Sequence, residues 1–87
     1  MSENMSASVI RVLCVDDHRL VREGISRIVG LHPDVQVVAQ ASNGEEAVET
    51  FRRIKPDVTL MDLQMPRMNG LQAILAIRAE ERDARIV

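Results

Sequence analysis

Two short apolar runs end in aspartate residues, and this pattern constrains the fold more than any other feature of the sequence. The run over 10–15 is followed by Asp16 and Asp17, and the run over 58–61 is followed by Asp62. Residues 12–15 are continuously apolar and residues 58–61 nearly so, which is typical of strands buried on both faces of a parallel sheet. If the two strands are parallel neighbours, the three carboxylates meet at one edge of that sheet.

Segments with helical periodicity separate these strands. Apolar residues recur at helical spacing over 20–29, 47–54 and 71–77. The segment 35–41 alternates with more polar residues, which is typical of a half-exposed edge strand. Alternating strands and helices predict an α/β fold with a parallel sheet. Because the first strand is the most apolar and the second the most polar, we expect the flavodoxin-like order 2-1-3, with its crevice between strands one and three.

The last residues extend this pattern. Residues 85–87 have the composition of the start of a fourth strand. The expected sheet is therefore 2-1-3(-4) and incomplete.

Capping residues predict where the three helices begin. We expect Asp17 to cap the first helix and Asn43 to cap the second. Glu46, three residues beyond Asn43, completes a variant of the capping box. Asn69 is expected to cap the third helix.

The apolar stripe of each helix is expected to face the sheet, and the charged residues of the first helix, Arg22 among them, to face solvent. The expected stripe of the first helix is Leu20, Val21, Gly24, Ile25, Ile28 and Val29. The expected stripe of the second helix is Ala47, Val48, Phe51 and Ile54. The expected stripe of the third helix is Leu71, Ile74, Leu75 and Ala76 or Ile77.

Three clustered carboxylates predict a cation site. Like charges raise each other's pKa, so Asp16, Asp17 and Asp62 cannot all stay ionised without a counterion. Oxygen ligands of this kind suit Mg²⁺, and the backbone carbonyl of Gln64 in the following loop is a further candidate ligand. A carboxylate beside such a metal can accept a phosphoryl group. The alternative interpretation is that these aspartates only cap helices, and His18 is expected to be a surface residue rather than a ligand.

Composition excludes several other classes of function. The net charge is −2 with mixed signs, so there is no electrostatic footprint for nucleic acid or an anionic membrane. No run approaches the ~20 apolar residues of a membrane span, and no nucleotide-cradling glycine motif or zinc-ligand spacing is present. Cys14 is the only cysteine and is expected to be a buried hydrophobe. Residues 1–8 lack a signal-peptide core and are expected to form a flexible tail, which favours a cytoplasmic location.

These residues resemble the receiver domain of two-component response regulators, in the subgroup with a LuxR-type helix-turn-helix output domain. The resemblance is carried by the segments 12–17, 17–24, 41–47 and 58–66 together with Gly70. It covers nearly all of the chain from residue 9 onward.

The resemblance implies a role for each acidic residue. Asp62 matches the phosphoacceptor, Asp16 and Asp17 match the acidic pair that binds Mg²⁺, and Gln64 matches the residue that offers a backbone carbonyl to the metal. The phosphate donor is then a phosphohistidine of a sensor histidine kinase, and the chain is a signalling module rather than an enzyme. The full-length protein is then expected to be a transcriptional regulator.

The sequence also departs from the family pattern. The family has five strand-helix pairs, with a switch Ser or Thr after strand four and a phosphate-binding Lys after strand five. Residues 9–87 stop at the start of strand four, and the only lysine, Lys55, precedes strand three. We therefore expect a partial receiver domain whose Asp62 is phosphorylated weakly or briefly.

This departure supports an alternative of another class. A truncated receiver with open strand edges and uncovered apolar faces is expected to associate with a second copy. In that interpretation the chain is a folding or dimerisation unit without phosphotransfer. A homo-oligomer is expected under either hypothesis.

Overall fold

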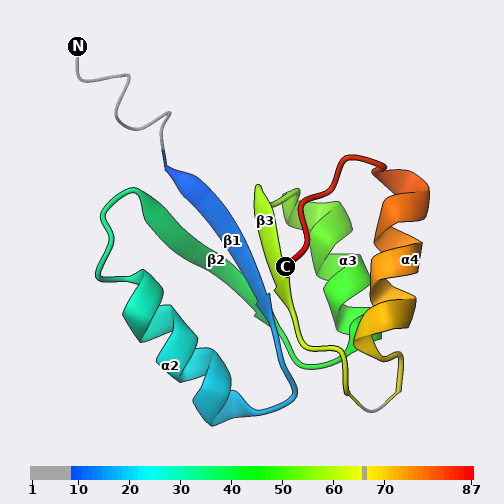
Figure 1. Cartoon of the computed structure of the whole chain (residues 1–87), viewed down its shortest axis with the longest axis horizontal. Coiled ribbons are helices and arrows are strands. Elements are labelled where there is room, and N and C mark those ends of the chain that lie inside the picture. Colours follow the sequence, from blue (N-terminus) through cyan, green and yellow to red (C-terminus); the bar gives the residue numbers. More distant parts are fainter. Residues whose placement is uncertain (1–8, 66) are drawn as a thin grey trace.

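A three-stranded parallel sheet with three helices forms the protein, as seen in a computed structural model that describes residues 9–65 and 67–87 (Figure 1). The elements in chain order are β1 (Ile10–Val15), α2 (Arg19–Val29), β2 (Val35–Ala41), α3 (Gly44–Ile54), β3 (Val58–Met61) and α4 (Gly70–Glu80). The strand order is β2-β1-β3, so the predicted flavodoxin-like α/β fold is confirmed. The expected tail, residues 1–8, lies outside the described residues.

The predicted fourth strand begins where it was expected. Ile86 forms a parallel bridge with Thr59. The backbone N–H of Met61 donates to the carbonyl of Val87 at 2.9 Å, and the N–H of Val87 donates to the carbonyl of Thr59 at 2.9 Å. The C-terminal residues therefore lie along the free edge of β3, which agrees with the order 2-1-3(-4).

The helices form two layers around the sheet. Figure 1 shows α2 on one side of the sheet, and α3 together with α4 on the other. The main core lies on the second side, where Leu13 and Val15 of β1 belong to one apolar cluster with Phe51 of α3 and Ile77 of α4.

Cys14 is fully buried, as expected, and burial raises the pKa of its thiol above the ordinary value. Burial of each large apolar side chain of the core, such as Leu13, contributes about 1.5–3 kcal/mol to the free energy of unfolding.

Two of the three helix caps were predicted correctly. The side chain of Asn43 accepts a hydrogen bond from the N–H of Glu46, and Asn69 forms a complete capping box with Gln72. The Glu46 carboxylate, however, accepts from the N–H of Ser42 at 2.7 Å rather than from that of Asn43. The capping box predicted for α3 was therefore wrong in one respect: Glu46 bonds to the residue before the cap, Ser42, instead of to Asn43.

The first helix has a different cap from the predicted one. α2 begins after His18 and not after Asp17, and His18 makes no side-chain cap hydrogen bond. Instead, a carboxylate oxygen of Asp16 accepts from the N–H of His18 at 2.9 Å. The turn that leads into α2 is thus closed by Asp16, two residues earlier.

The predicted inner face of α2 was partly wrong, although Ile25 and Val29 are partly buried as expected. None of its residues is fully buried, and the side chains of Leu20 and Ile28 are 81% and 63% exposed. Arg22, expected to face solvent, is only partly exposed, and its guanidinium bonds to the Asp16 carbonyl and to the Gln40 side chain. The long side chain of Arg22 can lie against the sheet while its charged group bonds at the strand end. Arg22 therefore faces inward, and the apolar side chains of Leu20 and Ile28 remain on the outer face of α2.

The predicted stripe of α4 was also partly wrong. Leu71 and Leu75 are 59% and 64% exposed, whereas Ala73 and Ile77 are buried. The inner side of α4 is formed instead by the buried residues Gly70, Ala73 and Ile77, with Ile74 packed against the core. Leu71 and Leu75 therefore lie on the outer side of the helix.

This difference between neighbouring residues of α4 is testable. We expect Ile77→Ala to lower the free energy of unfolding by about 2–5 kcal/mol, because it leaves a cavity in the core. We expect Leu75→Ala to change it by no more than about 0.5 kcal/mol, since the side chain is mostly in water. Urea denaturation of both variants checks this. Equal losses for the two variants would contradict the observed orientation of α4.

Candidate metal centre

The pairing of β1 with β3 brings the acidic residues to one edge of the sheet. Val15 and Met61, the last residues of the two strands, are register partners. The N–H of Asp62 donates to the carbonyl of Val15 at 3.0 Å, and the N–H of Asp16 donates to the carbonyl of Ala41 at 3.1 Å. Asp62 and Asp16 are therefore fixed by backbone bonds, each to the strand beside it.

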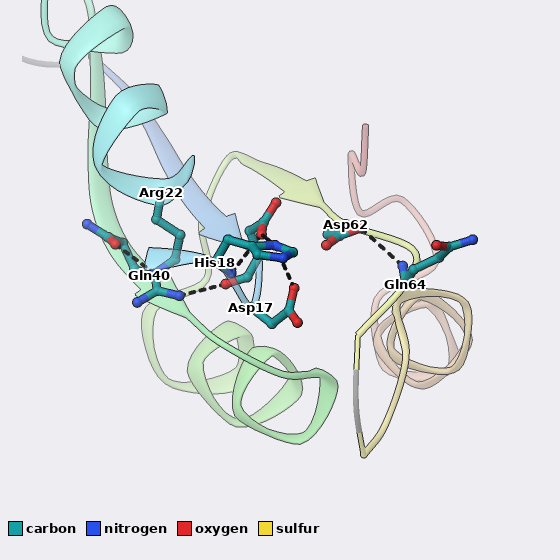
Figure 2. A network of polar contacts seen from close by, with 7 residues as sticks. Asp17, His18, Arg22, Gln40, Asp62 and Gln64 are labelled. Atoms are coloured by element: carbon teal, nitrogen blue, oxygen red, sulfur yellow. Dashed lines mark hydrogen bonds and ion pairs between the residues drawn. The ribbon is translucent and has the colours of Figure 1, made fainter. Parts of the chain in front are cut away.

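The predicted acidic cluster is present. Asp16, Asp17, His18 and Asp62 each offer one ligand atom, and these four atoms lie within 4.8 Å of one another. Figure 2 shows Asp17 and His18, from the end of β1, facing Asp62 from the end of β3. The side chains of Asp16 and Asp17 are 16% and 27% exposed, so the cluster is shielded but reachable from solvent.

His18 belongs to this cluster, which the sequence interpretation missed. Its side chain is 68% exposed, in agreement with a surface position, yet its Nδ1 lies 2.9 Å from Asp16 Oδ1 and 3.0 Å from Asp17 Oδ1. The hydrogen bond to Asp16, followed by the charge of Asp17, raises the pKa of His18 above its ordinary value. A histidine directly after two aspartates at a strand end was the available signal, because such a turn folds back on itself.

One carboxylate oxygen in the cluster has no hydrogen-bond partner. Asp17 Oδ1 is sealed from solvent and accepts no hydrogen bond from the described residues. The 3.0 Å contact with His18 does not satisfy it, because the Nδ1 hydrogen bond goes to Asp16. A buried, unpaired carboxylate oxygen is costly. Together with two further carboxylates, it gives the donor set that a divalent cation such as Mg²⁺ requires.

Gln64 lies beside Asp62, as the sequence predicted. Its backbone N–H donates to Asp62 Oδ1 at 3.0 Å (Figure 2). This bond fixes the orientation of the Asp62 carboxylate. That the Gln64 carbonyl binds a metal stays a prediction.

Glycine is required where α4 meets the end of β3. A Cβ added to Gly70 would lie 2.1 Å from the carbonyl oxygen of Asp62 and 2.6 Å from the Cα of Leu63. The N–H of Gly70 donates to the carbonyl of Leu63 at 3.2 Å. The start of α4 therefore buttresses the backbone of Asp62, and any side chain at position 70 would push the two apart.

Two basic residues differ in their relation to the cluster. Arg22 Nη1 donates to the backbone carbonyl of Asp16 at 2.6 Å, so it anchors the turn that carries the acidic pair (Figure 2). Lys55 precedes β3 and therefore lies at the opposite end of the sheet, where its Nζ is 3.7 Å from Glu81. The guanidinium of Arg22 thus supports the backbone of the cluster, while the only lysine of the sequence pairs with Glu81.

The fold and the cluster define a flavodoxin-like α/β domain with an acidic site at the crevice between β1 and β3. Residues 12–87 match the response regulator receiver domain, and the chain therefore belongs to this family. Among the described residues, no helix is both long and apolar enough to cross a bilayer.

Similar proteins support the family and the fold. The chain is 38% identical over 87 residues to the transcriptional regulatory protein DegU of Brevibacillus brevis, a match that covers 100% of this chain and 37% of DegU. A LuxR-family response regulator from Aurantimonas sp. SI85-9A1 has a TM-score of 0.86 at 40% identity, over 91% of this chain and 56% of that one. The CheX-CheY-BeF3-Mg²⁺ complex from Borrelia burgdorferi has a TM-score of 0.86 at 25% identity, over 93% and 62%. The chain thus spans only about a third of the length of DegU.

The close contact at Gly70 gives a prediction with a built-in control. We expect Gly70→Ala to destabilise the protein by about 1–3 kcal/mol, because the added methyl overlaps the backbone of Asp62. We expect Gly24→Ala to stabilise it by about 0.5–1 kcal/mol, since a Cβ at that helical position meets nothing within 4 Å. Urea denaturation measures both changes. If Gly70→Ala were as well tolerated as Gly24→Ala, α4 would not buttress the site.

Proposed function

We propose that this chain is a phosphoacceptor module in which Asp62 receives a phosphoryl group from a phosphohistidine of a sensor histidine kinase. The observation that carries the proposal is that one oxygen each of Asp16, Asp17 and Asp62, with a ring nitrogen of His18, lie within 4.8 Å of one another. Asp16, Asp17, Asp62 and the backbone carbonyl of Gln64 hold Mg²⁺ in this proposal. In it the chain accepts phosphate but is not itself an enzyme.

The geometry around Asp62 supports a role as nucleophile. Oδ1 accepts the hydrogen bond from Gln64, which leaves Oδ2 to attack the phosphorus. The new O–P bond forms as the P–N bond of the phosphohistidine breaks. The electron pair of that bond returns to the ring, which leaves as neutral imidazole when its other nitrogen is protonated.

The remaining residues of the site position this reaction. The backbone bond from Asp62 to Val15 and the contact with Gly70 hold the nucleophile in place, which is the main requirement of phosphoryl transfer. A bound Mg²⁺ supplies neutralisation of the charge on the carboxylate and phosphoryl oxygens. The Borrelia burgdorferi complex, which contains BeF3 and Mg²⁺ in a related fold, supports both ligands for this chain.

The relatives support an output role for the whole protein. DegU is a transcriptional regulatory protein, and the Aurantimonas sp. SI85-9A1 structure is of the LuxR family. We propose that the full-length protein regulates transcription and that this segment itself binds no nucleic acid. The described segment supplies the phosphorylation site on which such regulation depends.

Substitution of the acidic residues tests the proposal. We expect Asp17→Ala to weaken Mg²⁺ binding at least ~10-fold in calorimetric titration, because it removes a ligand rather than an outer-shell partner. We expect Asp62→Asn to abolish labelling by a phosphorylated sensor kinase. Asp83→Asn, an exposed aspartate at the other end of the sheet, is the control and is expected to change neither.

The lifetime of the phosphoryl group is part of the same test. Since Lys55 is paired with Glu81 far from Asp62, no lysine of this sequence neutralises the phosphoryl charge, and we expect the aspartyl phosphate to be short-lived in the 87-residue chain. Equal Mg²⁺ affinity in Asp17→Ala and the parent, or full labelling of Asp62→Asn, would refute the proposed function.

We also propose that the 87-residue chain self-associates through the outer face of α2. Leu20 and Ile28 lie eight residues apart on one side of this helix and are largely exposed, and Gly24 between them presents no side chain. Exposed apolar patches of this kind mark association surfaces. This property accompanies phosphotransfer and does not replace it.

Light scattering tests the association. We expect the parent chain to dimerise at micromolar concentration and the double substitution Leu20→Glu with Ile28→Glu to make it monomeric, because it places charges in the contact. Leu75→Glu, which adds a charge on the equally exposed face of α4, is the control and is expected to leave the dimer intact. A monomeric parent chain would contradict the proposal.

A further inference from the structure

We infer that His18 is a metal ligand that determines specificity, so that the acidic site binds transition-metal dications as well as Mg²⁺. This inference rests on the proposed function, since it concerns the same cation site. It goes beyond it because it assigns a nitrogen donor to a site otherwise made of oxygen.

The position of the imidazole supports direct ligation. His18 Nδ1 lies 2.9 Å from Asp16 Oδ1 and 3.0 Å from Asp17 Oδ1. Adjacent ligand atoms around an octahedral ion with bonds of about 2.1 Å lie roughly 3.0 Å apart. Nδ1 is therefore already at the spacing of a neighbouring ligand from both carboxylates.

The spread of the whole cluster is also close to what one ion requires. The four candidate ligand atoms lie within 4.8 Å of one another, and opposite ligands of the same octahedron are about 4.2 Å apart. Rotation of exposed or half-exposed side chains can close the difference, and the His18 ring is 68% exposed.

A purely structural role for His18 leaves part of the site unexplained. The hydrogen bond from Nδ1 to Asp16 satisfies one oxygen, and Asp17 Oδ1 remains sealed from solvent without a partner among the described residues. An ion bound between the two aspartates and the ring satisfies both carboxylates at once. Ligation needs the tautomer with the hydrogen on Nε2, which leaves the Nδ1 lone pair free for the metal.

The chemistry of the donors then sets the specificity. Carboxylate and carbonyl oxygens suit Mg²⁺, whereas imidazole suits ions such as Zn²⁺, Cu²⁺ and Ni²⁺. A nitrogen donor adds little to the binding of Mg²⁺, which strongly prefers oxygen and retains its waters. Removal of the imidazole should therefore reduce affinity for a transition metal far more than affinity for Mg²⁺.

The chain contains a matched pair of histidines for this experiment. His18 lies in the cluster, and His32 lies in the turn between α2 and β2, on the surface beside Pro33. Co²⁺ and Mg²⁺ affinities are measured by calorimetry for the parent, His18→Phe and His32→Phe, above the pKa of His18. Proton NMR of the two imidazole rings provides a second readout, because paramagnetic Co²⁺ shifts the signals of a ring that it binds.

We expect His18→Phe to lower the Co²⁺ affinity at least ~10-fold, because loss of even an outer-shell partner of a metal ligand costs about that much. The Mg²⁺ affinity is expected to stay near that of the parent. His32→Phe is expected to change neither. In the parent, Co²⁺ is expected to shift the ring signals of His18 strongly and those of His32 little.

Other results separate this inference from the proposed function. If His18→Phe leaves the ratio of Co²⁺ to Mg²⁺ affinity unchanged, the inference is overturned, while the proposed function stands as long as Asp17→Ala still weakens Mg²⁺ binding. If the parent binds neither ion, both are overturned.

Discussion

The parallel pairing of β1 with β3 is the constraint on which the rest of the structure depends. This pairing is what places Asp62 next to Asp16 and Asp17, through the backbone bond from Asp62 to Val15. The burial of apolar residues that pairs β1 with β3 therefore also brings three carboxylates together. Folding therefore concentrates negative charge at one edge of the sheet, and the cation proposed for this site would offset the resulting repulsion.

The strands could be predicted because burial on both faces leaves an unambiguous signal. Runs of mostly apolar residues marked β1 and β3, and the aspartates that follow them located the site. The helix faces were less predictable, since the periodicity gives a stripe but not the distance to the sheet. Arg22 lies inward because its charge reaches the Asp16 carbonyl, and Leu75 lies outward because α4 packs on the core through Ala73 and Ile77 instead. Both outcomes depend on tertiary contacts that no local pattern encodes.

His18 shows a different limit of the sequence. An exposed histidine after two aspartates is ordinarily a solvated residue, and its exposure agrees with that interpretation. Its place in the cluster depends on one local bond, from the His18 N–H to an Asp16 oxygen, which turns the chain back over the carboxylates. The residue types were visible in the sequence and are compatible with such a turn, but only the structure shows that the turn forms. The expected cap by Asp17 was wrong for the same reason, because Asp16 closes the turn instead.

The three aspartates differ in the hydrogen bonds that their carboxylates accept. The carboxylate of Asp16 accepts the hydrogen bond from His18, and that of Asp62 accepts the one from Gln64. Asp17 Oδ1 has no such bond among the described residues, although it is buried. A hydrogen bond compensates a carboxylate oxygen for lost hydration, whereas a buried oxygen without one is left uncompensated. Asp17 is therefore the carboxylate that a cation would compensate most, which supports its proposed role as a ligand.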